Sequence, residues 1–130
     1  MSASAIRLSF FKLNTANMEA ALRFYGDGFG FAITATFDEP DFIEHIMALP
    51  GQQTGPSLLL VEWKDARDVS VGGGHGPVGF EVDDLDAVYQ RLLELGATGT
   101  VEPFDMEGTK VAMLTDPEGH EIELIQLAKN

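Results

Sequence analysis

The sequence predicts an α+β fold built from two tandem βαβββ modules. Apolar and turn residues follow the order strand, helix and three strands, and the order restarts after a glycine-rich stretch. An offset of 67 residues, from Met18 to Leu85, carries the apolar helix positions of the first half onto apolar positions of the second. A chain of 130 residues suits one compact domain. We therefore expect a single domain over 1–130, with modules at 5–64 and 77–128 and a linker at 65–76.

In the first half, strands are expected at 6–13, 31–37, 42–49 and 58–61, where apolar residues alternate or run together. The last of these, Leu58-Leu59-Leu60-Val61, is uniformly apolar, which predicts a strand that is buried on both faces. The helix follows the turn 14–17, and Gly26, Gly28 and Gly30 are expected to stop it. Its apolar face is predicted from residues at helical spacing: Met18, Ala21, Leu22 and Tyr25.

In the second half, strands are expected at 78–82, 98–102, 110–114 and 122–127. Asp83 is the predicted N-cap of the helix, and Gly96 is expected to close it. Its apolar face is predicted from Leu85, Val88, Leu92 and Leu95. The turn Asp116-Pro117-Glu118-Gly119 precedes the last strand. Neither half could easily bury its sheet alone, which favours a tandem pair.

Composition excludes several classes of protein. Eight basic against twenty-one acidic residues give a net charge of −13, which argues against nucleic acid and anionic membranes as partners. The absence of cysteine excludes disulfides, thiolate metal sites and cysteine nucleophiles. No apolar run reaches the roughly 18–20 residues that span a bilayer, and the N-terminus lacks the pattern of a secretory signal. The cytoplasm is the expected location.

Several segments together resemble the vicinal oxygen chelate superfamily, which includes glyoxalase I, bleomycin-resistance proteins and extradiol dioxygenases. The segments are Gly79 to Ala87, Leu95-Gly96-Ala97 and Thr115 to Leu124 in the second half, and Arg23-Phe24-Tyr25 and Gly28 to Phe31 in the first. The resemblance covers nearly the whole chain. It implies that the sheets of the two modules curl into an open cup, and that the protein forms a homodimer.

In metal-dependent members of that superfamily, four inward-facing side chains hold a divalent metal that polarises vicinal oxygens of the substrate. The resemblance places these positions at Phe10, near Leu59, at Pro77 and at Glu123. Only Glu123 is a ligand type, so we predict no metal and no cofactor, and ordinary glyoxalase I activity is not expected. His75 or His45 would have to build any unusual metal site.

The last predicted strand carries a pair of carboxylates. Glu121 and Glu123 alternate with Ile122 and Leu124, so both carboxylates should face the cup, about 6.6–6.8 Å apart along the strand. Such a pair could hold a cationic group, and Glu123 is the one residue predicted as a catalytic general base. The alternative is a solvated strand face with two ordinary carboxylates.

The remaining ligand-binding candidates come from strand parity and aromatic character. Lys12 and Asn14 share the side of Phe10 on the first strand, and in glutathione-using relatives a basic residue near this strand's end helps to bind the substrate. Trp63 and Phe104 could form aromatic walls, and His45 shares an apolar strand face with Met47. His120, in the turn before the last strand, is expected to be exposed.

Three functional hypotheses remain open. The first is a metal-free protein that binds a small organic molecule in an apolar, acid-lined cup, as bleomycin-resistance proteins do. The second is a lyase or isomerase that uses Glu123 as general base or metal ligand. The third is an accessory domain without a reaction of its own. The lost ligand types and the net charge of −13 favour the first hypothesis.

Overall fold

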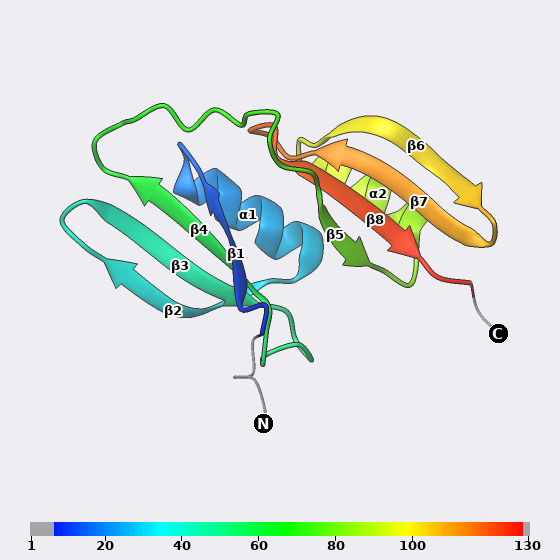
Figure 1. Ribbon diagram of the computed structural model, residues 1–130, viewed down its shortest axis with the longest axis horizontal. Helices are drawn as coiled ribbons and strands as arrows, with labels where there is room; N and C mark the ends of the chain where they lie inside the picture. Colours follow the sequence, from blue (N-terminus) through cyan, green and yellow to red (C-terminus); the bar gives the residue numbers. More distant parts are fainter. Residues whose placement is uncertain (1–6, 129–130) are drawn as a thin grey trace, which may run out of the picture. The chain divides into compact units, whose positions relative to one another are not determined.

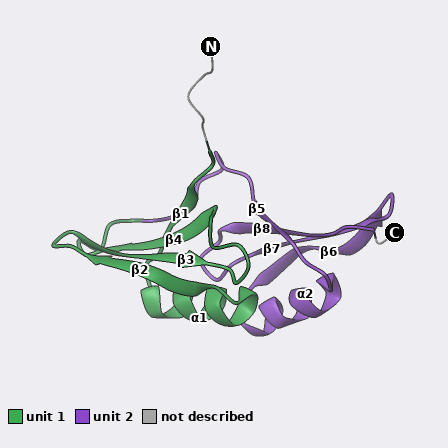
Figure 2. Cartoon of the chain, turned by 90° about the horizontal axis from the view of Figure 1, so that it is seen from below, with its two compact units in different colours: residues 1–68 green, residues 69–130 purple. Residues whose placement is uncertain are grey.

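A computed structural model describes residues 7–128, which form ten elements in the order β1, α1, β2, β3, β4, β5, α2, β6, β7 and β8 (Figure 1). The chain divides into two compact units, residues 1–68 and residues 69–130, coloured separately in Figure 2. Each unit repeats strand, helix and three strands, so the predicted α+β class and the two modules are confirmed. The boundary between the units lies inside the predicted linker 65–76.

Unit 1 consists of a four-stranded sheet and one helix. Its strand order is β1-β4-β3-β2; β1 and β4 are parallel neighbours, and the other neighbours are antiparallel. The helix covers one face of this sheet (Figure 2). The elements are β1 (Phe10–Asn14), α1 (Met18–Phe29), β2 (Ala32–Asp38), β3 (Phe42–Ala48) and β4 (Ser57–Trp63).

Unit 2 has the same topology, with strand order β5-β8-β7-β6. The first strand again pairs in parallel with the last, and the helix again covers one face. The strands β6 and β7 are longer than predicted and are joined by the two-residue turn Glu107-Gly108. The elements are β5 (Val78–Glu81), α2 (Leu85–Glu94), β6 (Thr98–Met106), β7 (Thr109–Thr115) and β8 (Glu121–Gln126).

Two helix boundaries differ from the sequence prediction. The helix α1 continues through Gly26 and Gly28 and ends only at Gly30, whose φ of 89° is the left-handed conformation that glycine adopts without strain. Gly28 is buried, so the missing side chain there allows close packing rather than ending the helix. The N-cap of α2 is Asp84 and not Asp83, since the Asp84 side chain accepts a hydrogen bond from the backbone N–H of Ala87.

A strand residue closes the start of each helix. Glu62 on β4 accepts a hydrogen bond from the backbone N–H of Met18 at 2.6 Å, and Gln126 on β8 accepts one from the backbone N–H of Leu85 at 2.7 Å. The first N–H groups of a helix have no partner within the helix, so these side chains satisfy donors that would otherwise need water. Both contacts join the helix to the last strand of its own unit.

The core of each unit lies between its helix and its sheet. Leu58, Leu59, Leu60 and Val61 are all at most 4% exposed, which confirms the predicted strand buried on both faces. In unit 2 the buried apolar residues are Leu85, Tyr89 and Leu92 on α2, Val111, Ala112 and Leu114 on β7, and Ile122 and Leu124 on β8. Within residues 7–128, no helix is long and apolar enough to cross a membrane.

Candidate functional site

The strand register separates two faces in the sheet of unit 1. Paired residues on neighbouring strands point to the same face. The side chain of Glu62 reaches the start of α1, so the residues that share its parity, including Leu60 and Met47, face the helix. The opposite face, which we call the open face, carries Phe10, Lys12 and Asn14 on β1 together with Leu59, Val61 and Trp63 on β4.

The open face of unit 1 holds four of the predicted ligand-binding residues, which form two contacting pairs: Lys12 with Phe10, and Trp63 with Asn14. The Nζ of Lys12 lies 5.6 Å from the ring centroid of Phe10 and 3.2 Å from Oε1 of Glu44. The Nε1 of Trp63 donates a hydrogen bond of 2.9 Å to Oδ1 of Asn14, which fixes the orientation of the indole. Aromatic, cationic and amide groups therefore alternate on one strand pair.

Glu44 is the most buried charged residue of this face, and the sequence analysis missed it. Its register partner on β4 is Val61, which places it on the open face, and its side chain is only 12% exposed. Lys12 is 45% exposed, so the ion pair joins a partly exposed lysine to a largely buried glutamate. Glu44 shares strand parity with Ile46 and could have been selected on that basis. The prediction selected the adjacent His45 instead, because His45 shares parity with apolar residues.

His45 lies on the helix side of the sheet. It pairs with Leu60 on β4, and its Nδ1 is 2.8 Å from the hydroxyl of Thr36 on β2. The parity with Met47 is as predicted, but that parity belongs to the face that α1 covers, whereas Lys12 and Trp63 are on the other face. The structure therefore does not bring His45 together with the other candidates of unit 1.

The loop after β4 adds a second cation to the open face. The guanidinium of Arg67 stacks 3.8 Å from the centroid of the Trp63 ring, and Phe42 meets the same indole edge-on with centroids 5.4 Å apart. The Arg67 guanidinium also donates hydrogen bonds to both oxygens of the Asp65 carboxylate, which lower the pKa of that exposed carboxyl. No sequence pattern indicated Arg67, because its place depends on how the loop turns back over the indole.

In unit 2, Gln126 plays the part of Glu62 and identifies the helix side. Ile122 and Leu124 share its parity and are buried, so Glu121, Glu123 and Ile125 lie on the open face, as predicted for the two carboxylates. Glu123 pairs with Gly79 on β5 and with Met113 on β7. Because glycine has no side chain, the Glu123 carboxylate has room on its β5 side.

The rest of this face carries apolar side chains, the threonines Thr98, Thr109 and Thr115, and a third carboxylate. Phe104 pairs with Val111, the partner of Ile125, so the predicted aromatic wall does lie on the face of Glu123. Glu81, the register partner of Ile125 on β5, adds an acidic group that the sequence analysis did not select. Three large apolar side chains of β6 remain 38–55% exposed: Val101, Phe104 and Met106. The basic side chain of Lys110 lies on the helix side, where Asp86 holds it at 2.8 Å and raises its pKa.

The residues at the superfamily's metal positions do not fit a divalent metal. Phe10 and Leu59 lie on the open face of unit 1 but offer no donor atom, and Pro77 immediately precedes β5. Among residues 7–128 there is no group of three or more histidine, aspartate or glutamate side chains placed to hold a metal ion. His75 lies exposed in the loop before β5.

His120 is more buried than predicted, with a side chain 12% exposed. Its Nδ1 lies 2.7 Å from Oδ2 of Asp116, and the other carboxylate oxygen of Asp116 accepts hydrogen bonds from the backbone N–H groups of Glu118 and His120. Asp116 is 4% exposed and organises the whole turn before β8. The turn sets the point at which β8 begins and hence the register of Glu121 and Glu123.

Solved structures share this two-module fold. Glyoxalase I from Zea mays superposes with a TM-score of 0.83 at 22% identity, over 95% of this chain and 46% of the maize chain, so this chain spans less than half of that protein. The antibiotic-binding protein TnmS3 from Streptomyces sp. CB03234 has a TM-score of 0.75 at 28% identity, over 98% of this chain and all of the other.

Sequence comparison gives the family itself. Lactoylglutathione lyase from Haemophilus influenzae is 26% identical over 119 residues, which are 88% of this chain and 87% of that enzyme. The model of the Glyoxalase/Bleomycin resistance protein/Dioxygenase superfamily matches residues 7–124. The chain belongs to this superfamily, and the resemblance noted in its sequence is confirmed.

Proposed function

We propose that this protein binds a small organic molecule on the open faces of its sheets, without the divalent metal of the superfamily's enzymes. The observation that carries the proposal is the replacement of metal-ligand types by Phe10, Leu59 and Pro77, while Glu123 is retained among the carboxylates and apolar side chains on the open face of unit 2. A surface with aromatic walls and few polar groups suits the binding of an organic molecule, because apolar contact supplies affinity and polar groups fix orientation.

The charges on the two open faces favour a ligand with a cationic or hydrogen-bond-donating group. In unit 1, Lys12 is paired with Glu44 and Arg67 with Asp65, so each cation has a carboxylate neighbour. In unit 2, the open face carries Glu81, Glu121 and Glu123, and the described lysine of that unit is on the other side. We infer that the carboxylates of unit 2 contact the polar part of the ligand, with Glu123 as the principal contact and Glu121 as a weaker one.

The similarity to TnmS3 supports the binding function, because that protein is described as antibiotic-binding and matches over its whole length. Relatives named lactoylglutathione lyase support the alternative, a lyase or isomerase in which Glu123 acts as a general base. The alternative lacks partners for Glu123. Within the described part of unit 2, no histidine or lysine lies on the open face to complete an acid–base pair.

We expect compounds from a panel of aromatic antibiotics and cationic aromatic dyes to bind saturably in calorimetry, which measures their affinity for the wild type. The Glu123→Gln variant should bind about 10–150-fold more weakly, as expected for the loss of a charged hydrogen bond.

Glu94→Gln is the matched control, since it removes the same charge from the exposed end of α2 in the same unit. It should bind with the affinity of the wild type. Equal affinity for the wild type and Glu123→Gln would show that the binding energy is carried elsewhere. Conversion of the glutathione–methylglyoxal hemithioacetal to lactoylglutathione by the wild type, lost in Glu123→Gln, would replace the proposal by the enzymatic alternative.

A further inference from the structure

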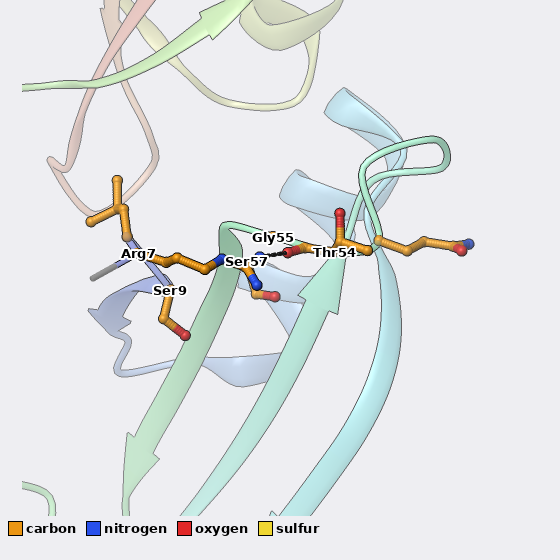
Figure 3. Close-up of a pocket in the computed structure, with 7 residues that line it drawn as sticks. Arg7, Ser9, Thr54, Gly55 and Ser57 are labelled. Atoms are coloured by element: carbon orange, nitrogen blue, oxygen red, sulfur yellow. Dashed lines mark hydrogen bonds between the residues drawn. The ribbon is translucent and has the colours of Figure 1, made fainter. Parts of the chain in front are cut away.

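The starts of β1 and β4 enclose a small polar cavity in unit 1. It has a volume of about 330 Å³, and Arg7, Ser9, Thr54, Gly55 and Ser57 are among its lining residues (Figure 3). The first and last strands of the unit run in parallel, so their starts lie together at one edge of the sheet. Asn14 and Trp63 mark the other ends of the same strands, roughly 16–20 Å away at the usual rise per residue.

The residues that line the cavity carry a net positive charge, although the chain as a whole is acidic. Acidic residues outnumber basic ones by twenty-one to eight overall, yet the cavity is lined by one arginine and by no aspartate or glutamate. Arg7 extends across the cavity and donates a hydrogen bond of 3.0 Å to the backbone carbonyl of Thr54 (Figure 3). That bond uses one of the five guanidinium N–H donors, and the others are available to an anion.

The neighbouring groups are donors as well. The side chains of Ser9 and Ser57 form no hydrogen bond with another residue in the described range 7–128, so their hydroxyl groups are free to donate. Gly55 turns the loop beside them with a φ of 102°, a conformation that other residues rarely adopt, and a side chain there would meet the carbonyl oxygen of Ser9 at 3.6 Å. The backbone of Ser57 is tied to that same carbonyl by a hydrogen bond of 2.9 Å.

We propose that this cavity is a second binding site, which takes the oxyanion group of a small organic molecule, a carboxylate or a phosphate. A guanidinium fork with adjacent hydroxyl groups is the arrangement that recognises such groups. The volume lies at the lower end of the range for small-molecule sites and exceeds what a bare ion needs. The site lies at the starts of β1 and β4, at the opposite ends of these strands from Asn14 and Trp63, and does not depend on the proposed function.

The test is a titration of the full chain with simple probes. Binding is monitored through the NMR chemical shifts of the backbone amide groups of Gly55 and Ser57. Acetate and glycerol phosphate are the two anionic probes, and acetamide and glycerol are their neutral counterparts. We expect saturable shifts with at least one anionic probe, with a dissociation constant of about 1–10 mM. Comparison of the two anions tells whether the site prefers carboxylate or phosphate.

Arg7→Gln should weaken binding about 10-fold or more, and Arg7→Lys should weaken it less, because it keeps the charge and loses the fork. Arg23→Gln is the matched control, since Arg23 is an exposed residue of α1 that pairs only with Glu19 in the described structure; its affinity should stay within about twofold of the wild type. The proposal is wrong if neither anion saturates the shifts, if the neutral probes shift these signals equally, or if Arg7→Gln binds as the wild type does.

Discussion

The ion pair between Lys12 and Glu44 gives a quantitative test of the open face of unit 1. Lys12→Met keeps the length and apolar stem of the side chain but removes its charge. Glu44, whose side chain is 12% exposed, then loses the cation 3.2 Å away that compensates its burial. Exposed ion pairs contribute about 0.2–1 kcal/mol, whereas breaking a fully buried pair costs about 3–5 kcal/mol.

The Lys12–Glu44 pair falls between these limits because its lysine is 45% exposed. We therefore expect Lys12→Met to lower the free energy of unfolding by about 1–2 kcal/mol. With a urea slope near 2 kcal/mol per molar, the midpoint of unfolding should fall by about 0.5–1 M. The measurement is urea unfolding followed by the fluorescence of Trp63.

A double-mutant cycle with Glu44→Gln separates the pair from the rest of the fold. Glu44→Gln alone removes the buried charge, so the double variant should regain at least half of the loss caused by Lys12→Met. A Lys12→Met midpoint within 0.2 M of the wild type, where about 0.5–1 M is expected, would refute the reasoning. So would a double variant whose loss is the sum of the two single losses, since additivity means that the groups do not interact.

Three further predictions concern metal, assembly and helix capping. Protein purified without chelator should contain no stoichiometric divalent metal by elemental analysis; one metal per chain, lost in Glu123→Ala, would contradict this. Light scattering at micromolar concentration should give about twice the chain mass of 14.1 kDa, because apolar side chains of both open faces are exposed; a mass of one chain would overturn the homodimer. Glu62→Ala and Gln126→Ala should each lower the free energy of unfolding by about 1–2 kcal/mol, and the exposed turn variant Glu39→Ala by less than about 0.5 kcal/mol, as measured in urea; equal losses in all three would exclude the capping role.

The element order could be predicted from the sequence because it depends on local patterns. The run Leu58 to Val61 and the alternation of Glu121 and Glu123 with Ile122 and Leu124 fix which strands are buried and which side of β8 is acidic. Helix ends were less predictable. Glycines at positions 26 and 28 predict the end of the helix. The packing of α1 against β4 overrides their low helix propensity, so the helix continues through both.

The parts of the site that were missed depend on contacts between distant segments. Parity correctly grouped Phe10, Lys12 and Asn14, but it could not say which of two adjacent β3 residues, Glu44 or His45, faces away from the helix. That choice is set by the pairing of β3 with β4, which no local pattern contains. The placement of Arg67 over the Trp63 ring likewise follows from a loop conformation and not from a spacing in the sequence.

The pairing of first strand with last in each unit has a consequence for how the chain acquires its structure. In unit 1, β1 finds its parallel partner 47 residues later, and α1 receives its capping carboxylate 44 residues later. Sheet and helix therefore cannot be completed until β4 has left the ribosome. All strand pairs of residues 7–128 nevertheless lie within a single unit. The chain between two paired strands is therefore shorter than about 65 residues, and the entropy lost in closing that loop does not depend on the length of the full chain. The duplicated plan thus limits the sequence separation over which each strand must find its partner.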